Sequence, residues 1–180
     1  MQLYAAHTPT PREHGSLLLA HAARQVWGLS PLPLHPPLPG GKPHFPAYPH
    51  CHFNLSHSGP YLLCGAGEEP VGVDIQIIKS NWRDALPKRV CSEDELFWLD
   101  KQPDRWRGFA RLWSMKESRV KWDGSGLTSS IRDIPIPLPP ETGNLCSRDG
   151  LWFRLYSGKD WEACMCCSFP PPEEISWIDL

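Results

Sequence analysis

Residues 71–76, Val-Gly-Val-Asp-Ile-Gln, form the stretch that decides the fold. Side chains alternate between the two faces of a strand, so Asp74 and Gln76 share one face while Val73 and Ile75 take the other. The apolar face suits a core, and the acid needs a partner because an isolated buried carboxylate is costly. The stretch predicts a core strand carrying a functional acid. The simpler alternatives for Asp74 are an ion pair or a turn cap.

Further short strands are expected on both sides of this one. Apolar runs separated by Gly and Pro turns predict strands at 53–56, 61–66 and 71–78. Residues 151–156 and 161–168 predict a closing antiparallel pair. Mixed strands and helices without regular alternation, and without an internal repeat, favour an α+β fold.

Three helices are expected between the strands. Thr10 to Glu13 reads as a capping box with proline at the first helical position, and Ser92 to Glu95 reads as a second capping box. The expected helices span 10–27, 92–99 and 105–122. Eight of the nineteen residues from Pro31 to Pro49 are proline, so that stretch predicts an extended loop or polyproline segment.

The composition limits the function classes. The chain has 180 residues, enough for one domain or two small lobes, and its net charge of -2 excludes a generally basic nucleic-acid binder. No apolar run approaches the length of a membrane span, and the start of the chain does not resemble a secretory signal. We therefore expect a cytoplasmic protein.

The seven cysteines are irregularly spaced. Clusters at 50–52 and 164–167 could be drawn as a zinc site, but neither has the paired spacing that closes a tetrahedral shell. Buried thiols in strands are the preferred interpretation.

A second acid lies in the longest expected helix. Glu117 and Lys121 are four residues apart and stack on one face, which alone predicts a solvated ion pair. Together, Asp74 and Glu117 offer two carboxylates. Mg²⁺ takes one or two carboxylates and completes its shell with water and substrate phosphates. Lys121 beside such a cation suits the charge that develops on a phosphate leaving group.

Two other features concern anions. His57 follows a short strand in a Ser- and Gly-containing turn, which presents backbone N–H groups to anions, although a histidine hydrogen-bonded in a loop is the simpler interpretation. Asn54 to Ser58 does not match the serine-hydrolase pattern. Residues 101–121 hold seven Lys or Arg against two acids, so they could face an acidic partner, cofactor phosphates or only solvent.

Five segments in order resemble one known family, the 4′-phosphopantetheinyl transferases, in the larger monomeric class that activates peptide synthetases. The segments are GKP at 41–43, FNLSHSG at 53–59, VGVDIQ at 71–76, CSEDE at 91–95 and LWSMKESRVKWDGSGL at 112–127. The resemblance implies two similar lobes related by a pseudo-two-fold axis. The N-terminal lobe would span residues 1–70 and the C-terminal lobe 71–180, with coenzyme A in the cleft between them.

The resemblance also implies roles in catalysis and metal binding. Asp74 and Glu117 resemble the metal ligands, and Gln76 stands where many members have a Glu ligand. Lys121 resembles the lysine that contacts the pyrophosphate. Glu95 matches a third acid of the family, a metal neighbour or base, although it is also the N3 residue of the second capping box.

Further residues match groups that hold coenzyme A in the family. They are Lys42, Ser56, His57, Lys116 and Arg24. Gly15 stands where the first helix of the family often starts with Arg, and the N-terminal lobe is shorter than in the best-known members.

The activity that the resemblance implies is Mg²⁺-dependent transfer of 4′-phosphopantetheine from coenzyme A to a serine of an apo acyl or peptidyl carrier protein. The leaving group would be adenosine 3′,5′-bisphosphate. The serine proton could go to Glu117, to Glu95 or to water on the metal, and the sequence does not choose among them. Two alternatives remain: a metal-dependent phosphohydrolase, and a non-catalytic module that binds coenzyme A or a carrier protein.

Overall fold

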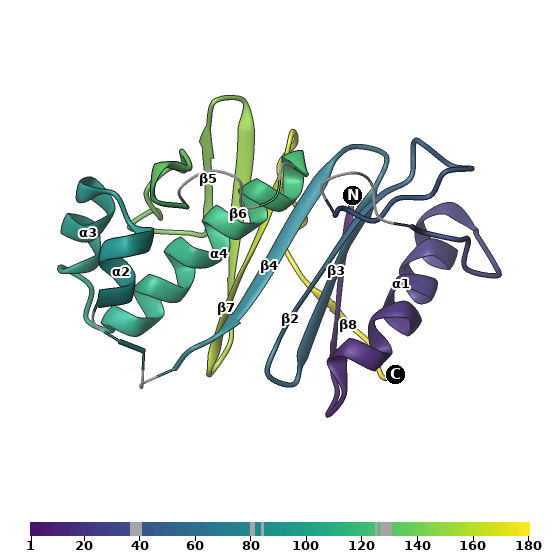
Figure 1. The fold of residues 1–180 in the computed structure, drawn as a ribbon, viewed down its shortest axis with the longest axis horizontal. Helices are drawn as coiled ribbons and strands as arrows, with labels where there is room; N and C mark the ends of the chain where they lie inside the picture. Colours follow the sequence, from purple (N-terminus) through teal and green to yellow (C-terminus); the bar gives the residue numbers. More distant parts are fainter. Residues whose placement is uncertain (37–40, 80–81, 84, 125, 127–130) are drawn as a thin grey trace.

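The computed structural model describes residues 1–36, 41–79, 82–83, 85–124, 126 and 131–180. Two four-stranded sheets lie side by side, and each carries a long helix (Figure 1). The α+β class expected from the sequence is confirmed. The pseudo-two-fold relation between two lobes stays a prediction.

The first sheet has the strand order β2-β3-β1-β8. Its strands are β1 (Gln2–His7), β2 (His52–Ser58), β3 (Tyr61–Gly67) and β8 (Ser176–Trp177). Helix α1 (Pro11–Trp27) packs on this sheet and buries Leu18, Leu19, Ala22 and Ala23 against it. β8 comes from the C-terminal end of the chain and pairs in parallel with β1, so the last residues join the first sheet.

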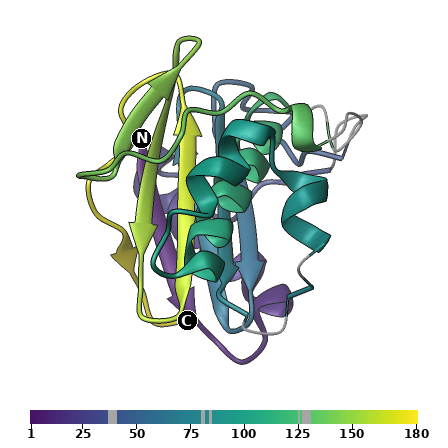
Figure 2. The ribbon, with the colours of Figure 1, turned by 90° about the vertical axis from the view of Figure 1, so that its left-hand side faces the viewer.

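The second sheet has the order β4-β7-β6-β5 and is antiparallel throughout. Its strands are β4 (Val71–Ile77), β5 (Leu145–Arg148), β6 (Leu151–Ser157) and β7 (Trp161–Cys167). Helix α4 (Arg105–Asp123) lies across β4 and β7. Two short helices, α2 (Ala85–Val90) and α3 (Glu93–Leu99), and the 3₁₀ turn η1 (Ile131–Asp133) complete this half. Figure 2 shows these helices on one face of the sheet.

Apolar side chains of the two sheets form a shared core. Val73 and Ile75 of β4 point away from α4 and pack with Leu3 and Leu63 of the first sheet. This is the apolar face that the alternation of residues 71–76 predicted. The core therefore joins the two halves along β4.

The structure confirms most of the expected ends of the helices. Gly28 and Gly124 terminate α1 and α4 with φ angles of 69° and 73°, in the left-handed region that favours glycine. Ser92 and Glu95 form a complete capping box at the start of α3. The box expected at Thr10 is absent: its side chain makes no cap hydrogen bond, and its Oγ1 lies 3.4 Å from His14 Nε2 instead.

Candidate active site

Asp74 is the centre of a polar cluster between α4 and the two sheets. Its side chain is buried, with 2 % of the residue exposed. Oδ1 accepts hydrogen bonds from Lys121 Nζ at 2.6 Å and Ser56 Oγ at 2.7 Å, and Oδ2 accepts one from Gln76 Nε2 at 2.8 Å. The structure thus brings together four residues that the sequence predicted for one site. The ion pair considered as the simpler alternative for Asp74 is also present.

Ser56 reaches Asp74 because side chains of β2 bond to the main chain of β4. Three alternate residues of β2 each accept a hydrogen bond from a backbone N–H of β4, with a constant offset along the chain. The pairs are Asn54 with Val73, Ser56 with Ile75 and Ser58 with Ile77, at 2.9, 3.4 and 3.1 Å. We call these three residues of β2 the side-chain ladder. It joins the edges of the two sheets where β2 and β4 lie next to each other in Figure 1.

Helix α4 reaches the cluster because it lies unusually close to β4. A Cβ atom built on Gly72 would lie 1.9 Å from the carbonyl oxygen of Ser118 and 2.5 Å from the backbone nitrogen of Trp122. Real Cβ atoms essentially never approach other atoms so closely, so only glycine fits at this position. The contact sets the distance between α4 and Asp74, and hence the position of Lys121.

Glu117 supplies a second carboxylate beside Asp74. Burial raises the pKa of Glu117 above its ordinary value, the negative charge of Asp74 raises it further, and Lys121 opposes both effects. Among the residues that the structure describes, the Glu117 side chain has no hydrogen bond or ion pair. Its oxygens are therefore available to a ligand. The ion pair expected between Glu117 and Lys121 is replaced by the contact of Lys121 with Asp74.

The donor set fits a hard divalent cation. Asp74 and Glu117 are carboxylates, and Gln76 has an amide oxygen that no described hydrogen bond occupies. No group of three or more His, Cys, Asp or Glu side chains suited to a metal occurs among the described residues. Two carboxylates are nevertheless within the usual range for Mg²⁺, which keeps water and substrate phosphates in its shell.

Glu95 and Lys116 form a separate cluster. Lys116 is completely buried; its Nζ lies 3.0 Å from Glu95 Oε1 and donates to the carbonyl oxygens of Ile131, Arg132 and Ile134. Glu95 also accepts the backbone N–H of Ser92 at 2.7 Å. The structure does not bring either residue to Asp74. An ammonium has three donors, all of them used here, so Lys116 has none for a phosphate of coenzyme A.

Lys42 also has internal partners. Its Nζ donates to the carbonyl oxygens of Val71 at 3.2 Å and Trp122 at 2.9 Å, tying the loop before β2 to β4 and the end of α4. Burial lowers the pKa of Lys42. Lys42 and Lys121 line one cavity of about 240 Å³, so Lys42 lies beside the cluster around Asp74. Its ammonium group nevertheless donates to backbone carbonyl groups.

His57 lies on the other side of β2. It is exposed and lines a cavity of about 490 Å³ with Arg12 and Glu13 at the start of α1. At the start of α1, Pro11 has no N–H group and the N–H of Glu13 donates to the carbonyl oxygen of Thr10, so the feature that suits an anion here is the positive charge of Arg12. Arg24 is twelve residues further along α1, about 18 Å along the helix axis, so the structure does not place it with His57. Arg12 was not predicted as a binding residue from the sequence, because there it forms part of an expected capping box.

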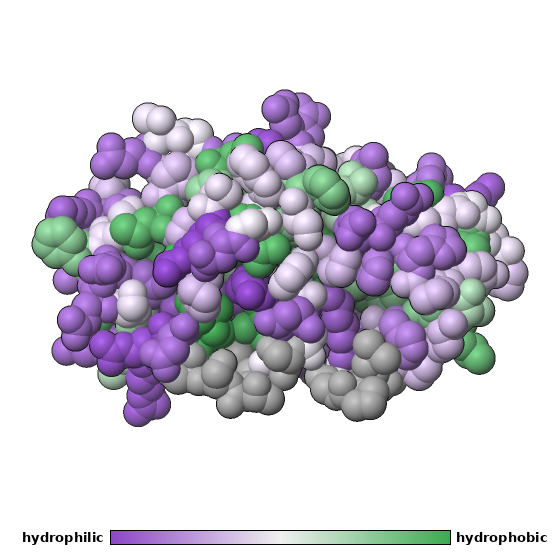
Figure 3. All heavy atoms as spheres, turned by 90° about the horizontal axis from the view of Figure 1, so that it is seen from above, coloured by the Kyte–Doolittle hydropathy of each residue, from purple (hydrophilic) through white to green (hydrophobic). Residues whose placement is uncertain are grey.

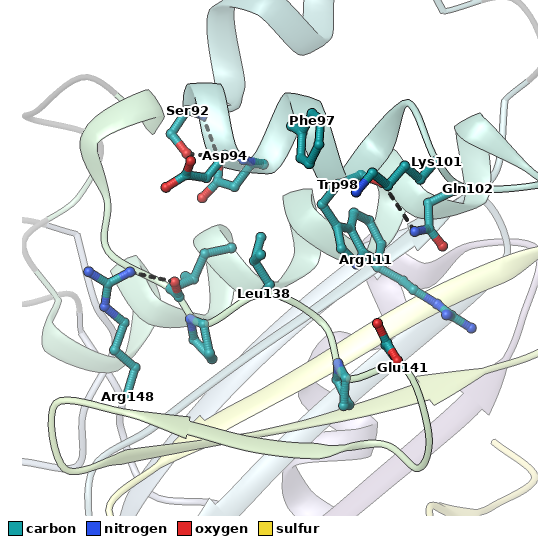
Figure 4. A pocket seen from close by; sticks show the side chains of 14 residues that line it. Ser92, Asp94, Phe97, Trp98, Lys101, Gln102, Arg111, Leu138, Glu141 and Arg148 are labelled. Atoms are coloured by element: carbon teal, nitrogen blue, oxygen red, sulfur yellow. Dashed lines mark hydrogen bonds between the residues drawn. The ribbon is translucent and has the colours of Figure 1, made fainter.

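A larger cavity lies elsewhere, between α3 and the segment after η1 (Figure 4). Its volume is about 710 Å³, and its walls include Phe97, Trp98, Lys101, Leu138 and Arg148. Neither Asp74 nor Lys121 lines it. The volume of a cavity therefore does not identify the candidate site in this protein. The site is identified by the charged side chains of Asp74, Glu117 and Lys121, which lie together.

Comparison with known proteins identifies the family. The 4′-phosphopantetheinyl transferase superfamily profile matches residues 70–166, which contain Asp74, Gln76, Glu117 and Lys121. The chain belongs to this superfamily. It is 38 % identical over 165 residues to a 4′-phosphopantetheinyl transferase of Bacillus subtilis, covering 87 % of this chain and 73 % of the relative.

Two further members of the superfamily show how far the similarity extends. The 4′-phosphopantetheinyl transferase Sfp of Bacillus subtilis (strain 168) is 38 % identical over 150 residues, covering 77 % of this chain and 65 % of Sfp. The human L-aminoadipate-semialdehyde dehydrogenase-phosphopantetheinyl transferase is 29 % identical over 127 residues, covering 63 % of this chain and 41 % of the human protein. The enzyme class expected from the sequence is confirmed.

Proposed function

We propose that this chain transfers the 4′-phosphopantetheine group of coenzyme A to a serine of an apo acyl or peptidyl carrier protein, in a reaction that needs Mg²⁺. The observation that carries the proposal is the cluster of Asp74, Gln76, Glu117 and Lys121 at the junction of the two sheets, in a member of the transferase superfamily. Two carboxylates can hold a divalent cation, and that cation together with a lysine can position a pyrophosphate and neutralise its charge.

In the proposed reaction, the serine oxygen forms a bond to the phosphorus that carries pantetheine. The bond from that phosphorus to the oxygen of adenosine 3′,5′-bisphosphate breaks, and the bisphosphate leaves with the electron pair. Asp74, Glu117 and Gln76 would hold Mg²⁺, which neutralises pyrophosphate charge when bound. Lys121 would stabilise the leaving phosphate. Glu117 is the better candidate for the serine proton, since Glu95 is engaged by Lys116 and Ser92.

The two ligand-facing regions suit a long substrate. Ser56 faces the cluster, and the next residue, His57, lines the cavity at the start of α1. A ligand that reaches both must bend around the end of β2. Coenzyme A has its pyrophosphate and its 3′-phosphate on opposite sides of a ribose, so we propose the cluster for the first and His57 with Arg12 for the second.

One assay tests the proposal. The protein is incubated with coenzyme A, Mg²⁺ and an apo carrier protein, and the mass of the carrier is measured. We expect the mass of one phosphopantetheine to be added, and only with all three components present. Degradation of coenzyme A without a carrier would indicate a phosphohydrolase, and binding of coenzyme A without any reaction would indicate a non-catalytic module.

A second assay tests the proposed phosphate site. Wild type should bind coenzyme A more tightly than coenzyme A lacking the 3′-phosphate. His57→Ala and Arg12→Ala should reduce that preference, whereas Arg24→Ala, on the same helix as Arg12, should not change it. Equal affinity of the wild type for both ligands would remove this assignment.

A further inference from the structure

Asp74 Oδ1 already forms an ion pair with a residue of the protein itself, Lys121. Lys121 Nζ donates to Oδ1 at 2.6 Å and to Ser56 Oγ at 3.0 Å. Ser56 Oγ in turn donates to Oδ1 and accepts the N–H of Ile75, so both of its lone pairs and its proton are used. The ammonium of Lys121 thus has a defined place, shared between a carboxylate and a hydroxyl group.

The need for this charge follows from burial. Asp74 is 2 % exposed, and an ionised carboxylate at such a site is costly unless it is paired. Among the described residues, Lys121 makes the ion pair with Asp74. Glu117 places a second negative charge nearby, which increases the demand for a cation. Without a bound metal, Lys121 meets part of that demand.

Lys121 can also leave this place. Its side chain is 26 % exposed, against 3 % for that of Asp74, and it borders the cavity that contains Lys42 and Gly124. It stands in the last turn of α4, on a flexible four-carbon stem. Lys116 has no such freedom, because its side chain is completely buried. Among these two lysines of α4, only Lys121 can move between the carboxylate and a ligand in the cavity.

We propose that Lys121 is an internal counter-ion which occupies the metal position at Asp74, and that a divalent cation binds there only by displacing it. This inference rests on the proposed function for the identity of the cation. Displacement releases the ammonium toward the cavity, where a ligand phosphate would receive it. The protein thereby keeps its two carboxylates from holding metal tightly before coenzyme A is present.

The proposal gives Lys121 effects of opposite sign on two measurements. Removing its charge should weaken catalysis, because the leaving phosphate loses a stabilising cation. The same change should strengthen metal binding to the free protein, because the competing ammonium is gone. A lysine that served only the phosphate would change catalysis and leave the metal affinity of the free protein unaltered.

The test is calorimetric titration of Mn²⁺ into the protein without coenzyme A. Lys121→Ala and Lys121→Met should bind Mn²⁺ at least about tenfold more tightly than wild type. Arg119→Ala is the matched control, since it removes one positive charge from the same helix at a side chain that pairs with Asp123. It should stay within about twofold of wild type. Equal or weaker Mn²⁺ binding by both Lys121 variants would overturn the proposal.

A measurement on the wild type covers the case in which the variants fold poorly. Lysines are acetylated briefly at increasing Mn²⁺ concentrations, and labelling of Lys121 is quantified by mass spectrometry against the exposed Lys101. Labelling of Lys121 should rise with Mn²⁺ and reach its midpoint at the calorimetric Kd. Unchanged labelling at saturating Mn²⁺ would overturn the proposal. Failure of carrier modification by the wild type would instead count against the proposed function, so the two failures are separate.

Discussion

Lys116 and Glu117 are consecutive residues whose side chains leave α4 in different directions. Lys116 is completely buried and pairs with Glu95 of α3, whereas Glu117 lies beside Asp74 with no described hydrogen bond. One residue fixes the helix to its surroundings, and the next faces the candidate site. The rotation of α4 about its axis, which Lys116 holds, therefore decides where the Glu117 carboxylate lies.

This arrangement predicts contrasting effects for two variants. Lys116→Met removes the charged partner of the buried Glu95, which keeps only the backbone N–H of Ser92, and should lower the free energy of unfolding by about 3–5 kcal/mol. Glu117→Gln should abolish carrier modification and leave the fold intact. Denaturant titration and the mass assay measure the two effects. The double variant Lys116→Met/Glu95→Gln should be more stable than Lys116→Met alone; equal stability would mean that the buried ion pair is not what holds the helix.

The raised pKa of Glu117 predicts a dependence of stability on pH. Because the folded protein raises the pKa above its unfolded value, ionisation of Glu117 opposes folding. The folded protein favours the neutral carboxyl group of Glu117. The stability that this preference contributes is present below the unfolded pKa and is lost as the pH rises through the folded pKa. Glu117→Gln should therefore raise the Tm at pH 8 and have little effect at pH 4, each kcal/mol corresponding to about 2–4 °C. Thermal melts without metal or coenzyme A measure this. An equal rise at both pH values would contradict it.

Gly72 predicts a clear difference between two Gly→Ala substitutions. Gly72→Ala places a methyl group against the backbone of α4 and should cost about 3 kcal/mol or more, with loss of activity as Glu117 and Lys121 shift. Gly15, inside α1, has no atom within 4 Å of the added carbon, so Gly15→Ala should stabilise by about 0.5–1 kcal/mol. Denaturant midpoints and transfer rates check both. Wild-type activity in Gly72→Ala would mean that the close approach of α4 is not required.

Gln76→Glu should tighten binding of Mg²⁺ to the protein without coenzyme A. Gln76 Nε2 donates to Asp74 Oδ2 at 2.8 Å. A glutamate loses that bond and adds a third carboxylate to those of Asp74 and Glu117, and a bound cation relieves the repulsion among them. The variant should be less stable than wild type without metal and gain more stability on adding Mg²⁺. Calorimetry and thermal melts measure both effects; identical Mg²⁺ affinity would place Gln76 outside the metal shell.

The cysteines should be chemically inert in the folded protein. Burial raises the pKa of Cys64 and Cys91 to about 12, and it raises that of Cys164 as well. Thiolate, the reactive form, is therefore scarce at pH 8. Iodoacetamide should modify these thiols slowly in the native protein and rapidly after unfolding, with transfer activity unchanged. Fast native alkylation that stops activity would give a cysteine a role at the site.

The sequence predicted strands β2, β3, β4, β6 and β7 and helices α1, α3 and α4 because their signals are local, and it missed β1, β5 and α2. Alternation located β4, and the glycines after α1 and α4 located the helix ends. β8 and the capping behaviour of Thr10 were not predictable in this way. β8 is two residues long and exists only through its pairing with β1, and Thr10 is drawn to His14.

The site was predicted where residue spacing carried the information. Strand alternation placed Asp74 and Gln76 on one face of β4, and helix spacing placed Glu117 and Lys121 on one face of α4. The expectation that the two pairs form one site rested on the resemblance, and in the structure Lys121 lies against Asp74. The predicted roles of Glu95, Lys116 and Arg24 came from the resemblance, which does not report which way a side chain faces. Burial directs Lys116 to Glu95, and distance along α1 separates Arg24 from His57.

Between β2 and β4, the hydrogen bonds of the side-chain ladder take the place of the main-chain hydrogen bonds that usually join neighbouring strands. Backbone bonds would form between any two strands of suitable length, but these bonds need a carbonyl or hydroxyl side chain at every second position of β2. The join therefore needs polar side chains of β2 in step with the backbone N–H groups of β4. Sliding β2 by two residues in the direction that brings Asn54 to the place of Ser56 would remove the hydroxyl partner of Lys121. The same three residues that fasten the two sheets thus also specify where one half of the active site stands relative to the other.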